Sequence, residues 1–224
     1  MSFSPKPEDN VLLAMLPESI RERLYSKLSL ISIPFKANLL GPKQSHLYFP
    51  AGCVISLLKS TKNGELAEIA LIGSEGMIDI SSFWDNGNTT FSTRVQHPGP
   101  AFMIHYNTFA EEFNSNIEMR SIVLHYTTSL VYQIAQIAVC NRHCKLDQQL
   151  CRWLLSMLDR LPSNTFKVTQ ETIANMLGVR REGVTLAATK LQMAGLIEYS
   201  RGSVTVLNRE KLKQRACECY KSIT

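Results

Sequence analysis

Residues 169–206 decide the fold, and they read TQETIANMLGVRREGVTLAATKLQMAGLIEYSRGSVTV. The sequence predicts a first helix over Gln170–Leu177, capped by Thr169, whose hydroxyl can accept a hydrogen bond from the first turn. Gly178 predicts a tight turn after this helix, because glycine readily adopts the left-handed conformation. A second helix is predicted from Arg180 to Met193.

The apolar spacing indicates that the two helices cross closely. Val184, Ala188 and Leu191 fall on one face of the second helix, at i, i+4 and i+7. Ala174 supplies the small side chain needed where two helices meet at about 90–120°. A small residue, a glycine and a branched residue in this order predict a helix-turn-helix.

Two short apolar runs follow, Leu196–Tyr199 and Val204–Val206, with a turn between them. They predict a β-hairpin. A helix-turn-helix followed directly by a hairpin is typical of a winged helix, and Arg201 at the tip of the wing can contact phosphate.

The outward face of the second helix carries side chains suited to a DNA groove. Arginine can donate two hydrogen bonds to a guanine edge, glutamate can accept one from cytosine N4, and threonine can contact a thymine methyl. A solvated, charged helix end is the alternative, but the hairpin favours DNA. We predict DNA contacts from Thr169, Gln170, Arg180, Arg181, Glu182, Thr185 and Arg201.

TQETIANMLGVRREGVT and the LIEYSRGSVTV hairpin resemble the DNA-binding end of the Crp/Fnr regulators, the cyclic-AMP receptor protein family. The usual recognition string R-E-[TS]-V reads Arg181-Glu182-Gly183-Val184 here, and Leu186 stands where the family often has arginine. The resemblance covers most of the chain, strongly from Cys140 onward. It implies a homodimer that binds palindromic double-stranded DNA and contacts RNA polymerase.

Charge and composition agree with a nucleic-acid partner. Residues 142–224 hold 14 Lys and Arg against 7 Asp and Glu, whereas residues 1–141 hold 10 against 12. No uninterrupted apolar run reaches the length of a membrane span, and the N-terminus lacks signal-peptide features, so we expect a cytoplasmic protein with no membrane partner. No P-loop, G-x-S-x-G or H-E-x-x-H motif occurs, so an enzyme is not expected.

The region before the long helix has a different character. Val11–Leu30 has apolar residues at helical spacing and predicts a helical cap. From Ile31 to about Phe109, short apolar runs alternate with turn residues, which predicts an antiparallel barrel or roll. The resemblance implies that this region corresponds to the family's cyclic-nucleotide-binding β-roll.

The family's nucleotide cassette is degenerate here. Members that bind cyclic nucleotide carry Gly-Glu-[Leu/Ile] and, further on, an arginine that neutralises the phosphate. This chain reads Gly76-Met77-Ile78-Asp79-Ile80, and Thr89 falls where the arginine should be. A buried phosphate without a cation is costly, so we expect an effector other than cyclic AMP, or none. Asp79, Thr89 and Thr90 are the predicted pocket positions, with ordinary loop and strand surface as the alternative.

A long helix is predicted from Glu111 to about Asn141, with apolar positions in steps of four and three that indicate a heptad seam. The resemblance implies parallel dimerisation through this helix. Packing of the seam against the roll is the alternative, although another face, with Val131, Ala135 and Ala138, can serve that purpose. The predicted seam consists of Val123, Thr127, Leu130, Ile134 and Ile137.

The six cysteines form no C-x2-C pair, and buried, reduced thiols without a metal cofactor are expected. The family's iron–sulfur sensors use cysteines near the N-terminus, and the first 52 residues here contain none. A cluster near the end of the long helix leaves open a thiol- or metal-based redox-sensing regulator on the same scaffold. The clustered residues are Cys140, His143, Cys144 and Cys151.

Together these patterns predict an α+β fold. Residues 1–110 form a β-roll sensor domain with its helical cap, 111–141 the dimerisation helix, and 142–224 the winged helix-turn-helix domain. Helices are also predicted over Leu146–Leu161 and Arg209–Tyr220.

Overall fold

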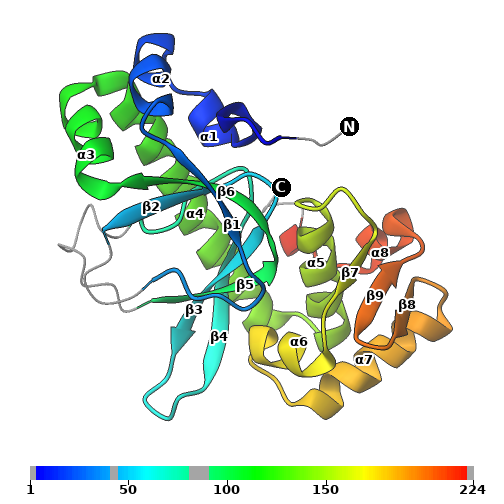
Figure 1. Ribbon diagram of the computed structural model, residues 1–224. Helices are drawn as coiled ribbons and strands as arrows, with labels where there is room; N and C mark the ends of the chain where they lie inside the picture. The colour runs from blue at the N-terminus through cyan, green and yellow to red at the C-terminus, as the bar shows by residue number, and fades with distance from the viewer. Residues whose placement is uncertain (1–3, 41–44, 81–90, 221–224) are drawn as a thin grey trace. The chain divides into compact units, whose positions relative to one another are not determined.

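The computed structural model describes residues 4–40, 45–80 and 91–220 (Figure 1). The chain divides into two compact units, residues 1–57 with 72–130 and residues 58–71 with 131–224. The division falls inside the long helix α4, Ile117–His143. The domain boundaries at residues 110 and 141 stay predictions.

The first unit contains an antiparallel sheet with the strand order β1-β6-β2. Its strands are β1 (Ser29–Ile33), β6 (Gly99–His105) and β2 (His46–Pro50). Phe49 lies opposite Phe102 in the register of β2 and β6, and both side chains are buried. Short helices complete the core of this unit, and these are α1 (Val11–Ala14), α2 (Glu18–Tyr25) and α3 (Tyr106–Ser115), with the 3-10 turn η1 (Pro7–Asp9) before them.

A second sheet has the order β4-β3-β5. Its strands are β4 (Leu66–Ile72), β3 (Val54–Ser60) and β5 (Ser92–His97). Val54 to Leu58 are all buried, which explains why apolar residues occupy successive positions of this strand on both sides of the buried Ser56. The predicted set of short strands is confirmed, and the helices and sheets together form the predicted α+β fold.

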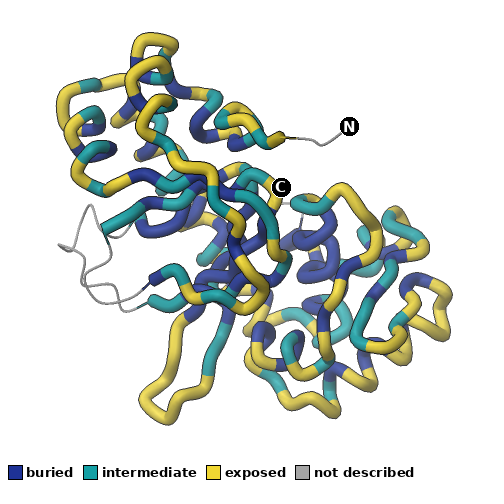
Figure 2. Tube along the Cα trace, in the orientation of Figure 1, coloured by how far each residue is buried: buried dark blue, intermediate teal, exposed yellow. Residues whose placement is uncertain are grey.

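The second unit carries the winged helix-turn-helix. Helix α5 is buried along Gln149–Leu158 and forms the centre of the unit's core (Figure 2). Around it lie the remaining helices and a small sheet of order β7-β9-β8. These elements are α5 (Leu146–Leu158), α6 (Gln170–Leu177), α7 (Arg181–Met193), α8 (Arg209–Arg215), β7 (Thr165–Lys167), β8 (Ile197–Ser200) and β9 (Ser203–Val206).

The helix predicted over Val11–Leu30 is wrong in its extent. Helix α1 ends at Ala14, and Pro17 stands at the N-cap of α2 with an extended ψ of 144°. Proline cannot continue a helix from the preceding turn. Leu30 belongs to β1 and lies opposite Phe102, so sheet pairing overrides the helical spacing at this end.

The helix predicted over Glu111–Asn141 is divided in two. Asn116 has an extended backbone, with φ −119° and ψ 119°, and its side chain accepts a hydrogen bond from the Met119 amide at 2.9 Å. Asparagine is a favourable N-cap, which explains why α4 begins anew at this point. The terminal helix is also shorter than predicted: α8 ends at Arg215, and Glu218–Tyr220 forms a 3-10 turn, η3.

Candidate nucleic-acid interface

The turn between α6 and α7 has the predicted geometry. The Thr169 hydroxyl accepts a hydrogen bond from the Thr172 amide at 3.1 Å and so caps α6. Gly178 ends the helix in the left-handed conformation, with φ 66° and ψ 36°. Ala174 and Val184 are buried in the contact between the two helices, 2% and 0% exposed. The small side chain and the glycine therefore allow the close crossing expected from the sequence.

The first turn of α7 is the exposed part of this module. Arg180, at its N-cap, and the side chains of Arg181, Glu182 and Thr185 are all exposed. Within residues 4–40, 45–80 and 91–220, neither arginine forms an ion pair. Unpaired, solvated guanidinium groups at one end of a helix are free to donate to phosphates or base edges.

A hydrogen bond joins the starts of the two helices. The Thr185 hydroxyl lies 2.7 Å from Gln170 Oε1 and 3.1 Å from the Arg181 carbonyl, and it can donate its single proton to either acceptor. Donation to Gln170 uses the oxygen of that side chain, so its amide nitrogen keeps both protons for donation. The structure therefore brings together two of the residues that the sequence assigned to DNA contact.

The wing turns through two residues in the left-handed region. Arg201 has φ 49° and Gly202 has φ 75°, the combination that a two-residue hairpin turn requires. Arg201 is exposed at the tip, as predicted from the sequence. A positive φ is uncommon for a residue with a Cβ, so arginine is held there by the hairpin rather than by its own preference.

The wing is fastened to the segment before α6. The Val168 amide donates to the Gly202 carbonyl at 2.8 Å, and the Tyr199 hydroxyl donates to the Val168 carbonyl. Burial raises the pKa of Tyr199 to about 12, with the Arg181 charge opposing this rise, so the hydroxyl stays a donor at neutral pH. Strand β7 extends the hairpin to three strands. The sequence does not predict this strand, because three residues are too few to show a period of two.

Two departures from the family string have structural consequences. A Cβ on Gly183 would lie 2.9 Å from the Leu146 side chain of α5, so glycine permits close packing where the family has serine or threonine. Leu186 is 65% exposed on the outer side of α7. An exposed leucine offers the duplex apolar contact but no hydrogen bond.

The predicted dimer seam on α4 is wrong for three of its five residues. Val123, Leu130 and Ile137 are 0%, 9% and 5% exposed within the single chain. Side chains buried in their own protomer have no surface left for a partner. Thr127 and Ile134 are half-buried beside them. The heptad spacing was real, but it marks the core-facing side of the helix.

Of the three predicted effector positions, Asp79 lies among the described residues. Asp79 is buried, 6% exposed, with φ 78°. Thr89 and Thr90 lie outside the described residues. The neighbouring Gly76 packs against α4, where a Cβ would come within 2.5 Å of the Tyr126 ring. The Tyr126 hydroxyl donates to the Met77 carbonyl at 2.9 Å, so the segment in the place of the nucleotide cassette is tied to the long helix.

The cysteines gather differently from the sequence expectation. Cys140 and Cys144 do lie together, but their other neighbours are Cys217 and Cys219. His143 is exposed and belongs to no metal-ligand group among the described residues. Cys151 is buried outside the cluster, and burial raises its pKa to about 12. Spacing along the chain could not reveal a partner pair so far away.

The comparisons with known proteins agree with this architecture. Residues 148–215 match the Crp-like helix-turn-helix domain, whereas no curated protein sequence shows a match. A protein assigned to the Crp/Fnr transcriptional regulators of Eubacterium rectale superposes with a TM-score of 0.73 at 16% identity, covering 93% of this chain and 98% of its own.

Two further structures show the same fold. FixK2 from Bradyrhizobium japonicum superposes with a TM-score of 0.69 at 11% identity, over 85% of this chain and 98% of its own. The c-di-GMP-responsive global regulator CLP from Xanthomonas campestris superposes with a TM-score of 0.67 at 14% identity, over 86% and 100%. The chain therefore carries a Crp-like helix-turn-helix domain on a scaffold with the fold of the Crp/Fnr transcription regulators.

Proposed function

We propose that the protein is a dimeric, sequence-specific DNA-binding transcription regulator of the Crp/Fnr type. The observation that carries this proposal is the exposed first turn of α7, with unpaired arginines, beside a wing that presents another. Arg181 would donate to guanine and Glu182 would accept from cytosine. Arg180, Thr185, Thr169, Gln170 and Arg201 would contact phosphates or flanking bases.

Glu182 argues for base recognition rather than simple phosphate binding. A carboxylate near the DNA backbone is repelled unless it meets a base donor such as cytosine N4. A dimer should select a palindrome with half-sites about one helical turn apart. For a regulator of this type we also expect contact with RNA polymerase and a cytoplasmic location.

Selection on random duplexes tests the proposal. We expect a symmetric motif, and Arg181→Ala should weaken operator binding by roughly 1–3 kcal/mol and relax one base position in each half-site. Lys190→Ala is the matched control, because it removes an exposed cation from the last turn of the same helix. If the selected duplexes share no symmetric motif, the proposal fails.

We infer that the dimer forms through the exposed side of α4. A largely apolar stripe there follows steps of four and three, and Ile117 and Val131 on it are 78% and 57% exposed. By length and composition α4 could also cross a membrane. Its inward side, however, carries buried polar and core residues, such as Gln133, which donates to the Leu71 carbonyl. The exposed stripe comprises Ile117, Ser121, Leu124, Thr128, Val131, Ala135 and Ala138.

Sedimentation can locate the seam. Val131→Glu should give a monomer, because it places like charges opposite each other at the centre of the stripe. Ser129→Glu introduces the same charge on a solvated face of α4 and should leave the dimer intact. A Val131→Glu protein that remains dimeric would move the interface elsewhere.

The effector is proposed to be a molecule other than cyclic AMP, or none. The sequence lacks the family's phosphate-binding arginine at Thr89, and CLP, with the same fold, is a regulator responsive to c-di-GMP. Titration calorimetry should detect no cyclic-AMP binding at micromolar concentrations. Saturable cyclic-AMP binding that raises operator affinity would contradict this part of the proposal.

A further inference from the structure

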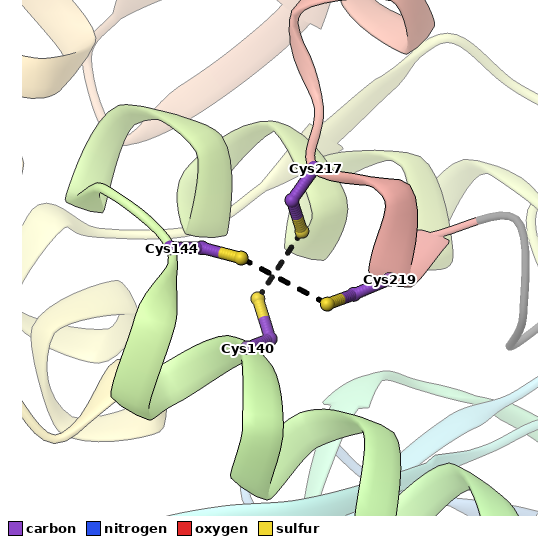
Figure 3. Close-up of side chains that lie close together, drawn as sticks. All are labelled: Cys140, Cys144, Cys217 and Cys219. Atoms are coloured by element: carbon purple, nitrogen blue, oxygen red, sulfur yellow. Dashed lines mark hydrogen bonds between the residues drawn. The ribbon is translucent and has the colours of Figure 1, made fainter.

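Four thiols converge where α4 ends. The Sγ atoms of Cys140, Cys144, Cys217 and Cys219 all lie within 4.8 Å of one another (Figure 3). The Cys140 and Cys217 sulfurs are 3.3 Å apart, and those of Cys144 and Cys219 are 3.8 Å apart. The first two residues lie one helical turn apart, and the second two are separated by a single residue. All four side chains point inward to a common centre (Figure 3).

We propose that these four cysteines form a tetrahedral thiolate site for a single Zn²⁺ ion. A Zn–S bond of about 2.3 Å in a tetrahedron separates its sulfurs by about 3.8 Å, which falls inside the observed spread. A polynuclear iron–sulfur cluster would hold its thiolates further apart, since several metal and sulfide ions lie between them. Four soft sulfur ligands with no oxygen or nitrogen ligand also favour zinc over magnesium or calcium.

The surroundings supply a compensating charge. Four thiolates around Zn²⁺ carry a net negative charge, which is costly to bury alone. Arg152 is 2% exposed, and its Nε lies 3.2 Å from the Cys140 sulfur. No carboxylate within the described part of the chain forms an ion pair with Arg152. A buried guanidinium facing a sulfur is explained when that sulfur is part of an anionic centre.

Side-chain contacts hold both halves of the site without help from the sulfurs. The Gln149 side chain donates to the Cys144 carbonyl at 3.0 Å. On the other half, Arg215 pairs with Asp147 at 3.5 Å, and the Tyr220 hydroxyl donates to Asp159 at 3.0 Å. These contacts fix the segment that carries Cys217 and Cys219 against α5 and its C-cap.

The site has a mechanical consequence. Cys144 directly precedes Lys145, the N-cap of α5, while Cys217 and Cys219 lie in the segment that follows α8. A bound ion would therefore fasten the end of α4 and the C-terminal segment to one point, next to the core helix of the DNA-binding unit. This role does not depend on the DNA-binding proposal, because the ion can be measured without DNA.

Metal analysis of the full chain tests the site. Protein purified under reducing, oxygen-free conditions without chelators should contain one zinc ion per chain, as measured by inductively coupled plasma mass spectrometry. After chelation, added Co²⁺ should give the thiolate-to-cobalt charge-transfer and d–d bands of a tetrahedral sulfur site, and Zn²⁺ should displace it. Cys217→Ser and Cys140→Ser should abolish stoichiometric binding, whereas Cys53→Ala, which removes a buried thiol of the other unit, should retain it.

Three outcomes would overturn the proposal. The first is metal-free wild-type protein that binds neither Zn²⁺ nor Co²⁺. The second is iron with inorganic sulfide in the protein purified without oxygen. The third is a pair of disulfides, Cys140–Cys217 and Cys144–Cys219, in the reduced preparation. The zinc content and the cobalt spectrum of the wild-type protein decide the question by themselves. The test therefore remains valid even if a serine variant fails to fold.

Discussion

The exposed N-terminal end of α7 and the four-thiol cluster lie in the same unit, yet the chain builds them in different ways. The first comes from one continuous stretch, in which Gly178, Ala174 and Thr169 each act on neighbours within a few positions. The second joins Cys140 to Cys217, which are 77 positions apart. The end of α7 could be predicted from the sequence, because its interactions join residues that are close along the chain. The four-thiol cluster forms only because α8 folds back along α5.

The largest expected effect on stability is that of metal binding at the four-thiol cluster. Zn²⁺ that binds only the folded chain should stabilise it by about 4 kcal/mol when free zinc exceeds Kd roughly 1,000-fold. Chelation should lower the melting temperature and expose amides of residues 216–220 to hydrogen exchange. Unchanged melting and exchange after complete metal removal would show that the cluster contributes nothing to stability.

The stability of the helix-turn-helix should be most sensitive to substitutions where α6 and α7 cross. Ala174→Leu should lower the free energy of unfolding by about 1–3 kcal/mol, because extra methylenes must fit between α6 and α7. Urea unfolding and operator binding measure the change. Asn175→Leu adds a similar side chain at the exposed neighbouring position, and it should change stability by no more than ~0.5 kcal/mol.

The cap of α6 should show a smaller effect. Thr169→Ala removes the acceptor for the Thr172 amide and should cost about 1 kcal/mol of stability. Thr169→Asn keeps a side-chain acceptor at the N-cap and should therefore retain most of the wild-type stability. Equal losses in both variants would mean that the methyl group of Thr169, not its hydroxyl, stabilises the helix start.

The smallest effect is expected at the wing, where stability and binding should move in opposite directions. Arg201→Gly relieves the positive φ of 49° and should stabilise the protein by less than ~1 kcal/mol. The same change removes a cation, so it should weaken DNA binding and reduce the magnitude of its salt-dependence slope by about 1. Arg201→Asn, which also tolerates this conformation, separates the loss of charge from the gain in flexibility.

The two faces of α4 show where pattern reading failed. Both faces repeat in steps of four and three, and the predicted dimer seam includes Val123, Leu130 and Ile137. These residues pack inside their own chain, while Val131 remains exposed. Helical periodicity reports that a face is apolar, but it carries no information about whether the same chain or a second copy covers it.

The sequence by itself determined the helix-turn-helix, its wing, the exposed residues of α7 and the roll of short strands, because caps, turn glycines and apolar periods act over a few residues. Only the tertiary structure decided which face of α4 is core, that Leu30 joins a sheet, and that Cys217 and Cys219 meet Cys140 and Cys144. Those outcomes depend on which distant segments pack together, and that choice follows from the summed burial of the whole unit.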